Sequence, residues 1–397
     1  MTIGSSNRTA LRRVEESTLG VIPTNPALQE FRYTGEGINF APTNTSSNEI
    51  RSDRQTADLV QVGSDATGNL DIELSFEAYD PELESVLFSD NTVVVNMASL
   101  ITLSVDAGND QINDSANGFI TAGIVVGQWI RTSGFSNSAN NDYFRVNTVT
   151  AGTITVDDPG NVLVTEAAGA SATIVGNMIR NGTTRKSYVI QKHIQDIAVP
   201  TFINYIGCVV GQMNLEMASG SIITGSFDYQ GLGVAAGTDG IGDSQISGAT
   251  IVAESTNTPM NAVNNIVNIL EDNAVSTNRF SNLSMSINNN LRVADAIGSL
   301  NHIDISAGRL EVTGSMNIYY ESRAAYERFI NGTFFSFSFR AQDAAGNAMI
   351  FTFPRVKQST GTLVAGGLDT DLILETEFTA ILDPTTDSMI QIDRFAA

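Results

Sequence analysis

The chain has 397 residues and a formal net charge of −22, from 21 Lys and Arg against 43 Asp and Glu. So acidic a protein lacks the cations that bind a phosphate backbone by releasing counterions, although DNA could still pass it without sticking. Hydrophobic residues make up 42%, and 34 Gly against 9 Pro favour many short strands joined by turns over a helical bundle.

The apolar segments are short. No run of 18 apolar residues is present, and the N-terminal stretch MTIGSSNRTALRRVEEST lacks the apolar centre of a signal peptide. We therefore expect a soluble protein that is made in the cytosol and contacts no membrane. The single cysteine, Cys208, cannot form an intrachain disulfide, and its apolar neighbours in NYIGCVV favour a buried thiol over a nucleophile.

The N-terminal third divides into an arm and a strand-rich segment. Residues 1–30 show little periodicity and are expected to form an N-terminal arm, disordered or docked on a neighbour. Residues 31–97 contain GNLDIELSFEAYD (68–80), whose alternation predicts a half-buried strand. A helix is expected to follow over DPELESVLF, with Asp80 as N-cap and Pro81 at its first position.

A long polar stretch precedes that strand. Residues 41–67 exceed the length of an ordinary turn, so they form either a mobile loop or a long hairpin that reaches another subunit. The charges Glu49, Arg51, Asp53 and Arg54 alternate in sign there. Such alternation suits pairing across subunits, although an exposed charged loop would show it too.

Residues 98–177 differ from their surroundings, because Arg131 and Arg145 are their only basic residues. They read as five or six short strands separated by turns, so we expect a self-contained β-domain inserted between two segments that belong together. It carries the only tryptophan, Trp129.

After the insertion, the chain resumes the strand pattern of residues 31–97 and then repeats it. Residues 178–235 resume long strands that complete a discontinuous first unit with residues 31–97. Residues 236–275 are interpreted as a linker and one helix over MNAVNNIVNILEDN. Residues 276–397 form a second unit, because GRLEVTGSMNIYY (308–320) resembles GNLDIELSFEAY and is likewise followed by a helix-like segment, ESRAAYERF.

Catalytic and ligand-binding signatures are weak. The two histidines, His193 and His302, lie far apart, and no spacing indicates zinc, a nucleophile elbow or a Walker loop. DAGNDQIND (106–114) spaces its aspartates as a calcium loop does but lacks the closing glutamate, so a turn is favoured and a weak cation site stays open. GLGVAAGTDGIG (231–242) lacks the lysine of a phosphate loop and suits a linker. We predict no enzyme, cofactor or metal centre.

Acidic side chains line the polar faces of several expected strands. Ordinary solvent-exposed sheet faces would also be polar, but they usually mix charges of both signs, and adjacent like charges cost stability. A surface that must repel a polyanion would not mix them. The shared-face carboxylates are Asp71, Glu73 and Glu77 in the first unit and Glu375 and Glu377 in the second, with Asp228 and Glu311 on other polar faces.

The ordered segments RYTGEGINF (32–40), SNEIRSDRQTADLV (47–60), GNLDIELSFEAYDPELESVLF (68–88), RNGTTRKSYVIQKHIQDI (180–197) and GSIITGSFDYQGLG (220–233) resemble the major tail tube proteins of long-tailed, noncontractile bacteriophages. The N-terminal arm is similar to that family's arm as well. The resemblance covers residues 5–97 and 178–240, and is only topological for 276–397. The inserted residues 98–177 are similar to the immunoglobulin-like or small-barrel modules that decorate phage tails, which implies a place on the tube exterior.

The resemblance implies a mainly β fold of two tandem β-sandwich or partial-barrel units, each with a flanking helix. It further implies a structural virion protein whose rings stack into a tube for DNA ejection, alongside tape-measure, terminator and tip proteins. The polar loop and N-terminal arm would contact neighbouring subunits. Because two units lie in one chain, three chains per ring are preferred, with six as the alternative. The lumen face would carry Asp71, Glu73, Glu77, Glu375 and Glu377.

Two other functions remain open at this stage. Another self-assembling surface or appendage subunit would share the strands, the acidity and the missing disulfides. A carbohydrate-binding adhesive β-protein would use the 98–177 module as its binder, and saturable sugar binding through Trp129 would favour it.

Overall fold

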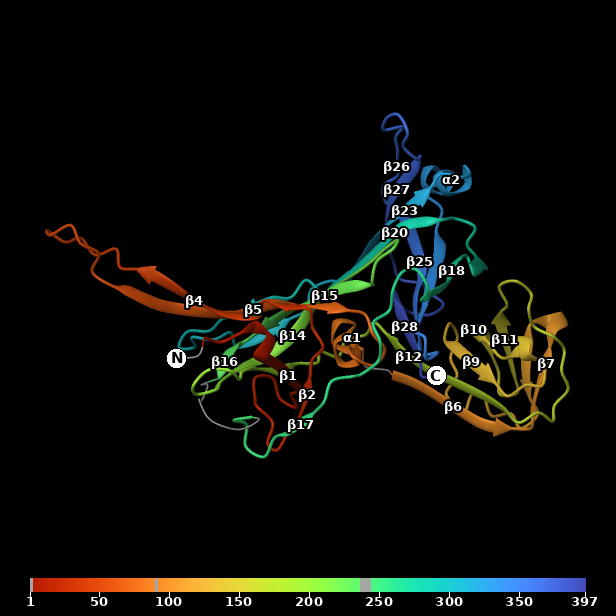
Figure 1. The fold of residues 1–397 in the computed structure, drawn as a ribbon, viewed down its shortest axis with the longest axis horizontal. Coiled ribbons are helices and arrows are strands. Elements are labelled where there is room, and N and C mark those ends of the chain that lie inside the picture. The colour runs from red at the N-terminus through yellow and green to blue at the C-terminus, as the bar shows by residue number, and fades with distance from the viewer. Residues whose placement is uncertain (1–2, 90–91, 236–243) are drawn as a thin grey trace.

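The computed structural model describes residues 3–89, 92–235 and 244–397, and its ribbon is shown in Figure 1. The described chain is mainly β, as expected, with two α-helices and no sheet closed into a barrel. None of its helices is long and apolar enough to cross a membrane. The expected mainly β class is therefore confirmed.

Six neighbouring antiparallel strands from both halves of the chain form what we call the central sheet. In order across the sheet they are β5 (Leu59–Glu73), β15 (Thr224–Gly231), β14 (Thr201–Ala218), β20 (Phe280–Asn288), β23 (Glu311–Tyr319) and β27 (Ile373–Ala380). Beyond β5 lie β3 (Gly35–Glu36) and β4 (Asn39–Ser46), and beyond β27 lie the end of β25 (Ala348–Gln358) and β26 (Thr362–Leu363). The sheet thus runs without interruption across the β14–β20 pairing.

The two halves repeat one order of elements. In the first half, the hairpin β4–β5 is followed by helix α1 (Asp80–Val86), then by β13 (Tyr188–Ile194), β14 and β15. In the second half, the antiparallel pair β20–β23 is followed by helix α2 (Ala324–Asn331), then by β24 (Phe335–Gln342), β25 and β27. In each half the last strand pairs back on the strand that precedes the helix. This order extends the short sequence similarity to whole elements.

The first half closes as two layers. Its outer layer holds β1 (Thr9–Glu15), β2 (Ala27–Glu30), β13, the first part of β14, β16 (Gly233–Ala235) and β17 (Thr250–Val252). Strand β14 passes from this layer into the central sheet at Gly207, which has φ +65° and where a Cβ would lie 2.5 Å from Leu232. Only glycine combines that dihedral with so close an approach.

The N-terminal arm expected over residues 1–30 is wrong for residues 9–15 and 27–30, which form β1 and β2 within the same chain. Strand β1 pairs along its whole length with β13, and Leu11 is buried in the main core. Sequence periodicity missed this strand because both faces of β1 are covered: Arg12 and Arg13 are as buried as Leu11, which removes the polar–apolar alternation.

In the second half, β25 pairs with β24, β27 and β28 (Gln391–Phe395). The outer strands of this half are β18 (Ile266–Glu271), β19 (Ala274–Val275), β24, β25 and β28. The helix expected over 260–273 is wrong, since residues 266–271 form β18 and pair with β24. The β-branched residues Ile266, Val267 and Ile269 favour a strand where such an edge is available.

The inserted segment has a hydrophobic core of its own. Its strands are β6 (Thr92–Leu100), β7 (Leu103–Asp106), β8 (Gln111–Asp114), β9 (Trp129–Ser133), β10 (Tyr143–Val149), β11 (Thr153–Asp157) and β12 (Ala172–Arg180). Strand β12 continues past residue 177 to pair with β28, so a shared strand ladder joins the insertion to the second half. Trp129 is buried at this junction, where its Nε1–H donates to Oγ1 of Thr352 at 2.9 Å.

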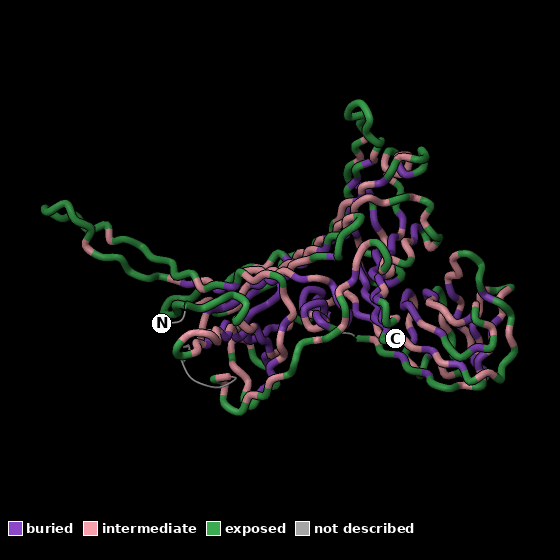
Figure 2. The backbone as a smooth tube through the Cα atoms, in the orientation of Figure 1, coloured by how far each residue is buried: buried purple, intermediate pink, exposed green. Residues whose placement is uncertain are grey.

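Two hairpins lie outside these layers. The β4–β5 hairpin projects far from the body, and its residues 43–62, called the hairpin arm below, are almost entirely exposed (Figures 1 and 2). Of the two alternatives for the polar stretch, the structure therefore shows the hairpin. The second hairpin pairs β21 (Arg292–Ala294) with β22 (Asp304–Ser306), between β20 and β23.

Candidate functional site

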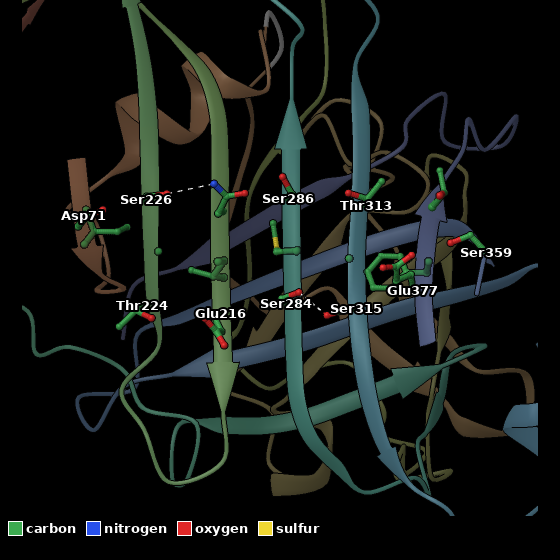
Figure 3. A pocket seen from close by; sticks show the side chains of 18 of the residues that line it. Asp71, Glu216, Thr224, Ser226, Ser284, Ser286, Thr313, Ser315, Ser359 and Glu377 are labelled. Atoms are coloured by element: carbon green, nitrogen blue, oxygen red, sulfur yellow. Dashed lines mark hydrogen bonds between the residues drawn. The ribbon is translucent and has the colours of Figure 1, made fainter. Parts of the chain in front are cut away.

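One face of the central sheet is polar from β5 to β27. Strand alternation sends large apolar side chains such as Leu70, Phe227 and Met285 into the main core and polar ones to the opposite side. Figure 3 shows these polar residues side by side across the strands. Antiparallel register aligns one row as Glu73, Thr224, Glu216, Ser284, Ser315 and Glu377, and the next as Asp71, Ser226, Asn214, Ser286, Thr313 and Thr379.

The polar face carries acids and no basic residue of its own strands. None of the six strands contains a Lys or Arg. Basic residues border the face. Arg279 directly precedes β20 and pairs with Glu321 at 3.3 Å, and Arg309 lies two residues before β23 and bonds Glu311 at 2.8 Å. Lys357, at the end of β25, stands opposite Thr379 of β27. The face's carboxylates are Asp71, Glu73, Asp228, Glu216, Glu311, Glu375 and Glu377.

The middle of the polar face is hollowed. A groove of about 780 Å³ lies over β5, β15, β14, β20, β23 and β27 and is lined mainly by Ser, Thr, Asn and acidic side chains. Two glycines allow the close packing under it. A Cβ at Gly225 would lie 2.6 Å from the carbonyl oxygen of Asn214, and one at Gly314 would lie 2.4 Å from the Phe378 ring.

The uncharged side chains of the polar face bond to one another. The Ser284 and Ser315 hydroxyls are 2.7 Å apart, Gln212 donates to Asn214 at 2.9 Å, and Asn69 donates to Asp71 at 2.7 Å. The carboxylates repel instead: burial raises the pKa of Asp228, and the charge of Asp71 raises it further. The arrangement offers no nucleophile, base and orienting group in contact, and its chemistry is that of a hydrated acidic surface.

The structure places four of the five predicted lumen residues on this face. Asp71 and Glu73 lie on β5, and Glu375 and Glu377 lie on β27 at the other side of the sheet. The expectation that Glu77 shares a strand face with Asp71 and Glu73 is wrong, because β5 ends at Glu73 and Glu77 lies in the turn before α1 with φ +59°. The apolar–polar alternation of sequence continues through that turn, which is why the strand was expected to be longer.

Glu216 is the residue that sequence reasoning missed. It stands between Thr224 and Ser284 in the middle of the sheet and is exposed. The signal was present in GQMNLEMA, where Gln212, Asn214 and Glu216 alternate with three buried apolar residues.

The predicted inter-subunit residues lie at the tip of the hairpin arm. Glu49, Arg51, Asp53 and Arg54 are all exposed there. Arg51 and Asp53 bond to each other at 2.8 Å within the chain. Their partners in an assembly stay a prediction.

Other candidate sites have structural roles in the described residues. Cys208 is buried, and burial raises the pKa of its thiol. Asp106 and Asp114 accept hydrogen bonds from nearby backbone amides, and no cluster of three metal-ligating side chains occurs in the described ranges. Most of the glycine run, at residues 236–242, lies outside the described residues.

Comparison with known proteins agrees with this geometry. None of the curated proteins compared matches the chain. A family model described as phage tail tube protein matches residues 6–380, nearly the whole length. The chain therefore belongs to the phage tail tube protein family.

Proposed function

We propose that the polar face of the central sheet forms the wall of the tail tube past which DNA moves. The family makes the chain a structural tail tube protein. The observation that carries the proposal is the polar face itself, because its six neighbouring strands, drawn from both halves of the chain, contain no Lys or Arg. The same face carries acidic residues on both its first strand, β5, and its last strand, β27.

The charge on the tube wall sets the friction that moving DNA meets. DNA carries one negative charge per roughly 1.7 Å of its axis. Lys or Arg on the wall would release counterions and hold the DNA at discrete places. An acidic and hydroxyl-rich wall repels the phosphates along the whole path, so it offers no binding well at which DNA would pause.

We further infer that rings of three chains stack into the tube. The two halves repeat one order of elements and meet at the β14–β20 pairing, so each chain supplies two similar units. Strands β4 and β26, at the outer edges of the central sheet, remain for pairing with other copies, which would protect them from aggregation. Tape-measure, terminator and tip proteins would be the tube's partners in the virion, and the role would be non-enzymatic.

The test is DNA ejection from particles whose tube carries Glu216→Lys and Glu377→Lys. We expect the variant to assemble tubes, because both side chains are exposed, and to eject DNA several-fold more slowly than wild type. Ejection at the wild-type rate would contradict the assignment of this face to the bore.

A matched control separates position from charge. Glu15→Lys and Glu254→Lys make the same charge change at exposed positions off the polar face. Ejection slowed equally by the control pair would mean that net charge, and not the polar face, sets the rate.

The adhesive alternative loses the sugar-stacking residue that was suggested for the 98–177 module. Trp129 is buried between the insertion and β25 and cannot stack on a sugar from solvent. The appendage alternative remains distinguishable by imaging: purified protein that forms solid fibres, with no bore wide enough for DNA, would support it over a tail tube.

A further inference from the structure

The loop between β20 and β23, residues 289–310, folds back on the first half of the chain, and we call it the return loop. Ile305 of β22 is buried against Phe88, Val209 and Leu232. Arg185 forms an ion pair with Asp304 at 2.7 Å. The loop that connects β20 and β23 of the second half therefore covers an apolar surface of the first half. The Arg185–Asp304 ion pair lies at the edge of this contact.

The hairpin arm is the corresponding connection in the first half, between β4 and β5, but it covers no other part of the chain that the structure describes. Ile50 at its tip is 99% exposed, and Leu59, Val60 and Val62 are exposed along β5. A two-stranded hairpin is marginally stable alone in water, so a partner surface is needed to hold this one.

The second half has an uncovered surface where the first half receives the return loop. Phe334 follows α2 as Phe88 follows α1, yet Phe334 is 43% exposed and Phe88 only 5%. Leu382 follows β27 as Leu232 follows β15, and the two are 54% and 7% exposed. We call Phe334, Leu382 and their neighbours Arg355 and Lys357 the Phe334 surface.

The charges of the Phe334 surface indicate an acidic partner. Arg355 lies 4.2 Å and Lys357 lies 5.5 Å from the centre of the Phe334 ring. Over the described residues neither forms an ion pair with a carboxylate, although the chain is strongly acidic. Arg185, the cation at the covered surface, has its carboxylate in Asp304.

The hairpin arm carries the complementary groups. Glu49 and Asp58 are exposed and form no ion pair in the described chain, and they flank the apolar Ile50, Leu59 and Val60. The arm therefore combines carboxylates with apolar side chains, as the β22 strand of the return loop does with Asp304 and Ile305.

We propose that the Phe334 surface is the docking site for the hairpin arm of a second copy of this chain. The inference rests on the proposed ring of two-unit chains, and it adds which surfaces meet. Each hairpin arm would cover the Phe334 surface of the next copy, as the return loop covers the first half of its own chain. Every unit in the ring would then be covered by a loop from the adjacent unit, either in the same chain or in the next copy.

A photocrosslinking amino acid on the arm tests the contact without assuming a register. A benzophenone side chain replaces Val60, tubes are irradiated, and the linked peptides are identified by mass spectrometry. We expect links between chains to peptides that contain residues 330–334 or 355–357. Links only to other peptides, or none between chains, would overturn the proposal.

Charge reversal provides a second, independent test of the contact. Arg355→Glu with Lys357→Glu is expected to raise the protein concentration needed for tube assembly about tenfold, and Glu49→Lys with Asp58→Lys is expected to restore most of it. Arg279→Glu with Arg323→Glu makes the same charge change at exposed cations of the second half and should leave assembly unchanged. The contact would be contradicted if the Arg355→Glu and Lys357→Glu variant assembled at the wild-type concentration. It would also be contradicted if adding Glu49→Lys and Asp58→Lys did not restore assembly.

The outcomes distinguish this proposal from the tube itself. Wild-type protein that forms hollow tubes without the expected links contradicts the docking site only. Wild-type protein that forms no tube under any condition contradicts the proposed function on which the site rests.

Discussion

Helix α1 shows at the scale of single residues how the acids of this chain are used off the polar face. Asp80 was predicted as the N-cap of this helix, but the structure begins α1 one residue earlier, with Tyr79 as N-cap and Asp80 as the first helical residue. Asp80, Glu82 and Glu84 all lie in α1. The structure gives them a further role, because each bonds a cation from a distant segment: Asp80 bonds Arg394, Glu82 bonds Arg13, and Glu84 bonds Lys186. The short helix therefore links β1 of the first half to β28 of the second half through ion pairs.

The Arg13–Glu82 pair is fully enclosed and gives the sharpest prediction at this scale. The two groups are 2.8 Å apart with side-chain exposures of 4% and 0%, and burial raises the pKa of Glu82 against the opposing effect of Arg13. Arg13→Met leaves a buried carboxylate without its partner and should lower the free energy of unfolding by about 3–5 kcal/mol.

Urea denaturation of three variants checks this. The double variant Arg13→Met with Glu82→Leu should recover most of the loss, because both charges are gone. Arg279→Met, at an exposed ion pair, should unfold as wild type does. A single Arg13→Met variant as stable as wild type would contradict the account of α1.

His302 predicts a pH dependence of stability. Its Nε2 lies 2.7 Å from Asp65 and its Nδ1 2.6 Å from Asp295, and two ionised carboxylates accept both bonds only from the doubly protonated ring. Partial burial lowers the pKa of His302, but the hydrogen bonds and charges of Asp65 and Asp295 outweigh it and raise the pKa above 6.5.

Because the folded-state pKa is raised, this stabilisation is fully present below the unfolded pKa and is lost as pH rises through the folded one. Wild type should therefore exceed His302→Gln in melting temperature at about pH 6, and the difference should shrink by about pH 9. The stabilised element is the return loop, which His302 holds against β5. A difference that grows with pH would have the wrong sign.

At the scale of elements, long alternating patterns were predictable and covered strands were not. The strand before α1, the helix α2 and the β14–β15 hairpin could be predicted from alternation, the proline and the turn residues. The end of β5 could not, since Glu77 continues the alternation while its backbone turns to φ +59°. The identity of β18 was decided by its pairing with β24, which local sequence does not encode.

The close packing of β20, β23 and β27 under the polar face depends on Gly314. A Cβ there would lie 2.4 Å from both the Phe378 ring and the Ser284 carbonyl oxygen, so Gly314→Ala should cost about 1–3 kcal/mol of unfolding free energy through overpacking. Gly366, with nothing within 4 Å of an added Cβ, is the matched control. Equal urea midpoints for the Gly314 and Gly366 variants would contradict this packing.

At the scale of the whole molecule, the insertion is joined to the second half by strand pairing and buried hydrogen bonds. Strand β12 runs from its core to β28, and Asp393 of β28 accepts the Trp129 backbone N–H at 3.1 Å. Burial raises the pKa of Asp393 to about 7. Composition marked the insertion out along the sequence, but the residues that fix it come from three distant segments, so its attachment could not be predicted.

The acidic wall could be predicted in outline, because Asp71, Glu73, Glu375 and Glu377 alternate with buried residues on their own strands. That these residues share one sheet depends on the β14–β20 pairing, and nothing local to either strand predicts it. The central claim is that this shared face lines the bore.

A helical reconstruction of assembled tubes by electron cryo-microscopy tests that claim most directly. The account predicts three chains per ring, with Glu216 and Glu377 facing the bore and the insertion outside. A tube in which the polar face points away from the bore, with Lys and Arg on the wall in its place, would contradict it.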